Sequence, residues 1–196
     1  MNPPAQVRKR LWLLAYSAHS FRKSQEACRL LLASVHDTKH DAYFPLVTAI
    51  HALYCRPFDH NRGIGRLSEA TVPTKHVGAH RFLTTFRDMV FIHSDSTPLP
   101  ESGRVLNLLS VRIDERVSLM PATPLPRLDS CERAIPCIDF MHKTVIKEID
   151  EIVRKYAKCF DREVGDYLFH LEGDVFLSPY EPPVTGKVVY RPDSDE

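Results

Sequence analysis

The sequence predicts a mainly α-helical domain, built as a bundle of about four helices that carries a small β-hairpin insertion. Three observations support this class. Four segments show apolar residues at helical spacing, one pair of short alternating stretches lies between the third and fourth segments, and no internal repeat or low-complexity tract occurs. The 196 residues fit one domain, which we place at residues 1–172, followed by a proline-containing, acidic-ended tail at 173–196.

The first two helices are expected over residues 5–35 and 41–54, with Pro57 ending the second. The start of the chain has the outline of a signal peptide, because three basic residues precede the apolar run at 11–15. That run is broken early by His19, and no small-residue cleavage site follows it. We therefore interpret this segment as the start of an amphipathic helix.

Residues 56–72 are predicted to form a loop, since Gly63 and Gly65 stand there among polar residues. The Gly-Ile-Gly lacks the third glycine and the preceding strand of a nucleotide-binding fingerprint, which favours an ordinary packed loop. A third helix is expected to begin near Pro73 and to run to about His93.

The second half of the chain predicts a hairpin and one long helix. Partial strand alternation at 104–113 and 116–120 indicates the hairpin. The long helix, over residues 131–160, has the clearest amphipathic stripe of the chain, formed by Ile138, Met141, Val145, Ile149, Ile152, Tyr156 and Phe160. From Gly173 onward, four prolines and an acidic end predict a loosely ordered tail.

The overall composition excludes several classes of protein. A net charge of +1 gives no overall attraction to nucleic acid, so any such contact requires a local basic patch. No stretch reaches about 18 uninterrupted apolar residues, so no membrane span is expected. The five cysteines are scattered, without Cys-x-x-Cys spacing, which indicates reduced thiols in a cytoplasmic protein rather than disulfides or a zinc site.

Arg87 and His93, on the third predicted helix, are the residues of greatest chemical interest. They are six positions apart, about 120° around an ideal helix, so spacing alone does not direct both at one target. They converge if the helix ends or distorts at His93, or if the same helix of a second chain completes the site. Each residue also has a purely structural interpretation. His93 would cap or fill the end of a core helix, and Arg87 would be a rim arginine paired with a nearby acid.

The segment from Arg87 through Asp88 to His93 resembles the Arg-to-His motif of HEPN domains. Together with residues 54–58, 63–67 and 93–95, it is similar to stand-alone bacterial HEPN-like proteins of the abortive-infection type. The likeness spans roughly residues 54–95, less than a quarter of the chain. One departure is Ile92, where such proteins often have a small residue, and its larger side chain would narrow the approach to His93.

The resemblance implies an all-helical homodimer in which two motifs meet in a cleft between subunits. Active members of the family are metal-independent endoribonucleases, need no cofactor and leave a cyclic phosphate. The resemblance assigns proton abstraction from a ribose 2′-hydroxyl to His93 and phosphate binding to Arg87. Asp88 would hold Arg87, or His93 of the partner subunit, in place. RNA is the implied substrate because DNA lacks the 2′-hydroxyl.

Arg56, Arg66, His76 and His80 are the further candidate RNA-binding residues. His76 and His80 lie four positions apart, which is also the geometry of a two-histidine metal site. No glutamate lies between them and no third ligand is apparent nearby, so no metal is expected. These two histidines line an RNA-facing edge beside Arg87 or are simply exposed to solvent.

Two functions from different classes follow. The first is an RNA-cleaving HEPN dimer acting in phage defence or in toxin–antitoxin growth arrest, with the antitoxin as a separate protein. The second is a non-catalytic helical dimer, an interaction module in which Arg87 and His93 stabilise the interface. Catalysis predicts that both residues are exposed in a basic cleft, whereas the interaction module predicts that both are buried and satisfied by hydrogen bonds.

Overall fold

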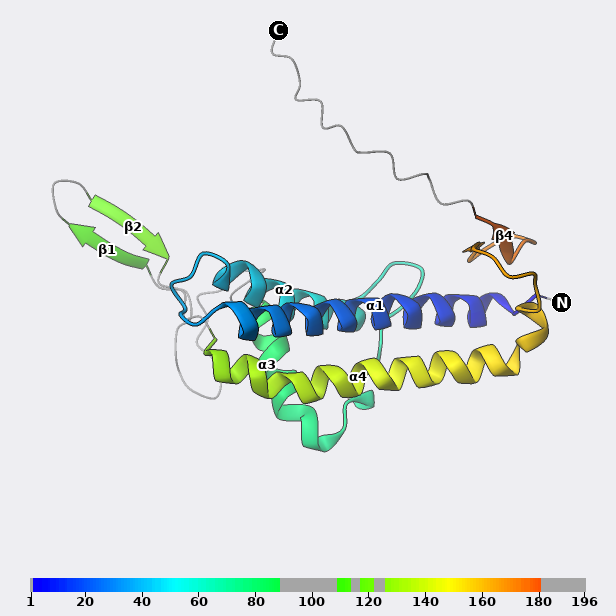
Figure 1. Cartoon of the computed structure of the whole chain (residues 1–196), viewed down its shortest axis with the longest axis horizontal. Helices are drawn as coiled ribbons and strands as arrows, with labels where there is room; N and C mark the ends of the chain where they lie inside the picture. The colour runs from blue at the N-terminus through cyan, green and yellow to red at the C-terminus, as the bar shows by residue number, and fades with distance from the viewer. Residues whose placement is uncertain (1, 89–108, 114–116, 122–125, 181–196) are drawn as a thin grey trace, which may run out of the picture.

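The computed structural model describes residues 2–88, 109–113, 117–121 and 126–180 of the chain (Figure 1). His93 and the other predictions for the remaining residues lie outside this part. The described elements follow the order α1 (Ala5–Ser34), α2 (Tyr43–Cys55), η1 (Arg56–Phe58), η2 (Glu69–Thr71), η3 (Thr74–His76), α3 (Val77–Phe86), β1 (Leu109–Ile113), β2 (Val117–Pro121), α4 (Leu128–Lys155), η5 (Ala157–Cys159), β3 (Tyr167–Phe169) and β4 (Leu177–Pro179). The predicted mainly helical fold with a small hairpin is confirmed.

The two long helices, α1 and α4, lie side by side and antiparallel, and they form the long axis of the molecule (Figure 1). Arg10, near the start of α1, makes a bidentate ion pair with Glu148, near the end of α4, at 2.6 and 2.7 Å. Farther along the pair, the Gln25 amide donates to Asp139 at 3.0 Å. These two cross-links fix the register of α1 against α4.

The shorter helices complete the core, with α2 packed on α1 and α3 packed between α2 and α4. Buried serines on α1 allow a close approach of the backbones, and the Ser24 hydroxyl donates to the Ile50 carbonyl of α2 at 2.8 Å. Large apolar and aromatic side chains from the helices fill the space between them, and they include Phe21, Leu31, Tyr43, Tyr54, Leu83, Ile138 and Met141. Burial of these side chains supplies the main stabilising free energy of the fold.

Helix α4 shows the predicted stripe but ends earlier than predicted. Ile138, Met141 and Val145 are buried, and the next two stripe residues pack against the same core. The helix ends at Lys155 instead of residue 160, because Tyr156 leaves helical geometry at φ −112° and ψ 26°. The remaining stripe residue, Phe160, packs its ring against Phe176 with a centroid distance of 5.3 Å.

The other predicted elements agree with the structure, with shifted boundaries. The first two helices are confirmed, and Pro57 lies in the 3₁₀ turn that follows α2. Helix α3 begins at Val77 rather than at Pro73, because a 3₁₀ turn occupies residues 74–76. Strands β1 and β2 pair antiparallel from Leu109 opposite Pro121 to Ile113 opposite Val117, as the predicted hairpin requires.

A second hairpin, β3–β4, was not predicted. It pairs Tyr167 with Pro179 and crosses the expected domain boundary between residues 172 and 173. Phe176, in the connection between the strands, is buried against Phe160 and Phe169. The short strands carry too little alternation to be found in the sequence, and residues 173–180 belong to this folded unit.

None of the described helices combines the length and the apolar character needed to cross a membrane. The exposed face of α1 carries Arg22, Lys23 and Glu26, and that of α4 carries Lys143 and Lys147.

Ile138→Ala should lower the free energy of unfolding by about 2–5 kcal/mol, because it opens a cavity in a fully buried site. Ile146→Ala on the same helix removes the same atoms from a residue that is 39% exposed, and it should cost much less. Urea denaturation of both variants measures the difference. Equal losses would show that α4 does not bury the predicted face.

Candidate functional site

Arg87 lies at the end of α3, where the backbone changes from an α-helix to a π-helical turn at residues 87–88. Its backbone N–H donates to the carbonyls of Leu83 and Thr84. Turns of this kind often mark functional sites in helices. The helix therefore departs from ideal geometry at the first motif residue, while His93 lies outside the described residues.

Two carboxylates hold the Arg87 guanidinium. Its Nη1 donates to Asp59, and its Nε donates to Asp88 Oδ1 at 2.5 Å, with Nη2 also 2.5 Å from that oxygen. The Arg87 side chain is only 16% exposed. Burial opposes the charged form, but the hydrogen bond to Asp59 and the two negative charges raise the pKa of Arg87 above its ordinary value. The predicted pairing of Arg87 with a nearby acid, and with Asp88 in particular, is present.

Asp59 is a site residue that sequence reasoning missed. It follows η1, whose Pro57 and Phe58 are buried, so the chain leaves the core at this point. The Pro57 carbonyl accepts from Leu67 N–H at 2.7 Å, and the Asn61 amide donates to the Asp59 carbonyl at 3.1 Å. These bonds anchor the loop that presents Asp59 to Arg87. In the sequence, the only signal for this site residue was the apolar pair Pro57-Phe58 directly before Asp59.

The turn within this loop depends on two glycines. Gly63 and Gly65 have φ values of 77° and 95°, a region that side chains with a Cβ rarely adopt. The Gly65 N–H donates to the Asn61 carbonyl at 3.0 Å and closes the turn. The prediction of an ordinary packed loop agrees with this geometry.

Helix α3 is tied to α2 through the Leu83 carbonyl, one turn before Arg87. His51 Nδ1 donates to this oxygen at 2.9 Å, and the Cys55 thiol donates to it at 3.6 Å. Because a carbonyl only accepts, His51 is the tautomer protonated at Nδ1. Burial lowers the pKa of His51 to about 4, although the bond to Leu83 opposes this shift. The core therefore contains a neutral histidine that fixes the end of α3.

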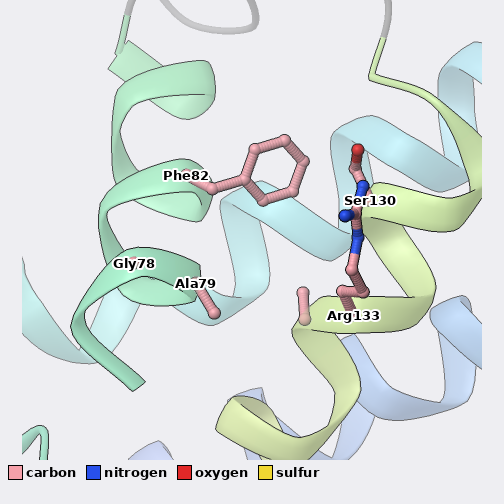
Figure 2. Close-up of a pocket in the computed structure, with 6 residues that line it drawn as sticks. Gly78, Ala79, Phe82, Ser130 and Arg133 are labelled. Carbon is pink, nitrogen blue, oxygen red and sulfur yellow. The ribbon is translucent and has the colours of Figure 1, made fainter. Parts of the chain in front are cut away.

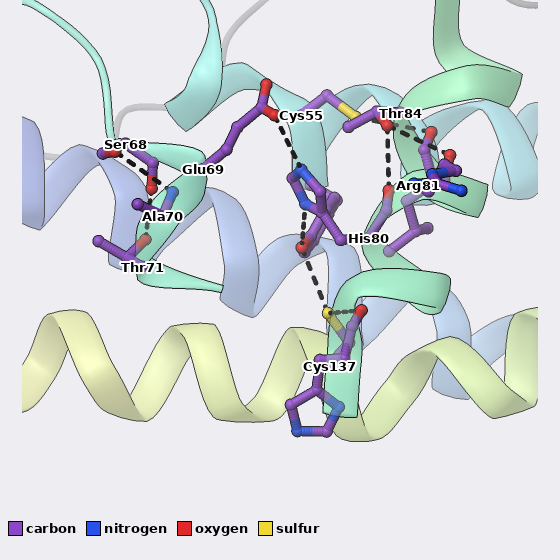
Figure 3. A network of polar contacts seen from close by, with 12 residues as sticks. Cys55, Ser68, Glu69, Ala70, Thr71, His80, Arg81, Thr84 and Cys137 are labelled. Atoms are coloured by element: carbon purple, nitrogen blue, oxygen red, sulfur yellow. Dashed lines mark hydrogen bonds and ion pairs between the residues drawn. The ribbon is translucent and has the colours of Figure 1, made fainter. Parts of the chain in front are cut away.

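Tyr54 joins three helices through a second polar network. Figure 3 shows three other members of this network, Glu69, His80 and Cys137. Its hydroxyl lies 2.9 Å from Nδ1 of His80 on α3 and 3.3 Å from Sγ of Cys137 on α4. Nε2 of His80 lies 4.0 Å from the Glu69 carboxylate, which can only accept. Burial raises the pKa of Tyr54 and lowers that of His80, so both groups are neutral at pH 7.

The predicted RNA-binding residues differ in their exposure to solvent. His80 is only 7% exposed, so the expectation of a solvent-facing or RNA-facing side chain is wrong for this residue. The physical reason is that the ring packs on Tyr54 and Phe58 instead of reaching the surface. His76 is half-buried beside Phe140, with ring centroids 5.4 Å apart.

The two predicted arginines lie at the surface. Arg66 is exposed, and the exposed Arg56 places its guanidinium 4.8 Å from the centroid of the Tyr16 ring. Both belong to the loop that also carries Asp59, so cationic side chains and the partner of Arg87 share one segment. Among the described residues, no group of three or more histidine, cysteine or acidic side chains is arranged to hold a metal ion.

A groove of about 410 Å³ lies between α3 and α4 (Figure 2). Phe82 faces Ser130 and Arg133 across it, and Gly78, Ala79 and Ala134 complete its lining. Phe82 and Arg87 are five residues apart, about 140° around an ideal helix. The groove therefore opens on another side of α3 from the Arg87 cluster, and it does not form part of that site.

Comparison of the chain with protein-family models, curated proteins and solved structures finds no match. The HEPN resemblance accordingly depends on the residues of this chain alone.

The stability of the fold should fall as the pH drops from about 6.5 to about 4, by up to about 3 kcal/mol from His51. The folded-state pKa of His51 lies below its unfolded value, so protons bind preferentially to the unfolded chain over this range. His51→Gln should be less stable than wild type at pH 7 and should lose this part of the pH dependence. Urea denaturation at pH 7 and pH 4.5 measures both effects.

The exposed His36 provides the control, since His36→Gln makes the same substitution outside the core and should leave the free energy of unfolding at pH 7 close to that of wild type. A His51→Gln variant with the same pH dependence as wild type would show that the buried imidazole is not the responsible group.

Proposed function

We propose that this chain is a HEPN-type, metal-independent endoribonuclease that acts as a homodimer in the cytoplasm. The observation that supports this function best is the way in which the Arg87 side chain is held. It follows the last residue of α3, with its guanidinium fixed by Asp59 and Asp88. An oriented guanidinium is what a phosphate-binding catalytic residue requires, because little reorganisation is then needed when charge develops in the transition state.

The proposed reaction is an internal transesterification of RNA. Neutral His93 takes the proton from the ribose 2′-hydroxyl, and the 2′-oxygen attacks the adjacent phosphorus. The bond from phosphorus to the 5′-oxygen breaks, and that oxygen leaves with a proton from water. The products are a 2′,3′-cyclic phosphate and a 5′-hydroxyl end. Arg87 binds the non-bridging phosphate oxygens, and Asp88 keeps its guanidinium in place.

The proposed RNA contacts lie on the loop that follows α2 and on the 3₁₀ turn that precedes α3. Arg56 and Arg66 are exposed on this loop, and His76 is partly accessible at the start of α3. In this proposal they supply the positive charge for RNA contact, since the net charge of the whole chain is only +1. Growth arrest or phage defence is the corresponding biological role, with a separate antitoxin protein as the regulator.

A second function is favoured by a specific observation. Arg87 is largely buried and its charge is balanced by two carboxylates, which is the geometry expected of a non-catalytic interaction module. In that function the Arg87 cluster stabilises the fold and an interface between two copies of the chain. The two functions differ in whether RNA is cleaved, so a cleavage assay separates them.

Wild-type protein incubated with a mixed RNA pool in the presence of EDTA should cleave it and leave cyclic-phosphate ends. His93→Ala and Arg87→Ala should each reduce the rate by about 100-fold or more, since each removes a group that acts in the transition state. End-group analysis of the products by mass spectrometry identifies the chemistry.

His36→Ala and Arg154→Ala remove an exposed side chain of the same type elsewhere, and both should cleave RNA at the wild-type rate. Circular dichroism confirms that each variant is folded. Absence of cleavage by folded wild-type protein, over varied RNAs and protein concentrations, would exclude the ribonuclease and leave the interaction module.

A further inference from the structure

We infer that Asp59 is a positioning residue, which orients the Arg87 guanidinium for phosphate binding. This inference rests on the proposed ribonuclease function. Asp59 belongs to the loop after α2, whereas Arg87 belongs to the end of α3. The hydrogen bond between them spans 28 residues of sequence. Among the described residues, it ties the guanidinium to an element outside α3.

Asp88 cannot supply this function alone. It is the sequence neighbour of Arg87, so both residues move together if the π-helical turn shifts. Asp59 is held independently of that turn, because η1 is anchored by buried Pro57 and Phe58 and by the bond from Leu67 to the Pro57 carbonyl. A carboxylate on a separate, anchored element defines one orientation of the Arg87 side chain.

The hydrogen bonds also leave donors for a ligand. A guanidinium has five N–H groups. Asp88 engages Nε and Nη2, and Asp59 engages Nη1. One N–H on each terminal nitrogen is left without a partner among the described residues. Each of these two groups can donate to a phosphate oxygen.

The same carboxylate has an electrostatic cost. Asp59, Asp88 and Arg87 together carry a net charge of −1, which disfavours the approach of a phosphodiester. Removal of the Asp59 charge should therefore strengthen RNA binding, while loss of its hydrogen bond should slow the chemical step. Loss of a residue with a purely structural role would not strengthen RNA binding while slowing the chemical step.

Asp59→Ala and Asp59→Asn separate these two effects. Both variants remove the negative charge, but the asparagine carbonyl can still accept from Arg87. Both should therefore lower KM for RNA. Asp59→Ala should reduce kcat by about tenfold or more, whereas Asp59→Asn should retain most of it. Steady-state kinetics on one defined RNA, with thermal unfolding of each variant, provide the measurements.

Asp150→Ala is the matched control, because Asp150 is an exposed aspartate on α4, and both kinetic constants should remain unchanged. If Asp59→Ala fails to fold, Asp59→Ser replaces it, since the shorter hydroxyl also removes the carboxylate acceptor. An active wild type with equal kcat values for the alanine (or serine) and asparagine variants would overturn the positioning role alone. A wild type that cleaves no RNA would overturn the ribonuclease and the positioning role together.

Discussion

The arrangement of the site depends on one buried tie between α2 and α3. The Leu83 carbonyl accepts from His51 and from Cys55, so two side chains of α2 hold the backbone of α3 one turn before Arg87. This carbonyl also accepts from the Arg87 N–H, and a histidine that remains neutral in the fold adds a further bond without bringing a charge into apolar surroundings. The backbone that carries Arg87 is thus held from inside the bundle, while Asp59 and Asp88 orient its guanidinium.

Charge balance is the second constraint on the site. An arginine that is mostly withdrawn from solvent needs partners, and Asp59 and Asp88 provide them. The same two carboxylates orient the guanidinium and weaken its attraction for phosphate. A nuclease built on this cluster would bind RNA weakly through Arg87 itself, and it would depend on Arg56 and Arg66 of the neighbouring loop for affinity. A non-catalytic interaction module would need only the orientation of the guanidinium by the two carboxylates.

Helical periodicity was sufficient to predict the long elements but not the site around Arg87. Helix α1 and the buried half of α4 follow from apolar spacing, because their faces meet one continuous core. Asp59 and His80 could not be placed in this way. Asp59 reaches Arg87 through a loop whose course depends on tertiary contacts, and His80 is buried by Tyr54 and Phe58 from other elements. Spacing along one helix contains no information about what covers it.

The hydroxyl of Tyr54 contacts one side chain from α3 and one from α4, and this has a consequence for the dynamics of the chain. A helix as short as α3, with 10 residues, is marginal in isolation and owes its order to docking. Its amide protons should therefore exchange with solvent mainly through opening of the whole bundle rather than through local fraying. The Arg87 cluster would then form and disappear together with the fold, as part of one cooperative unit.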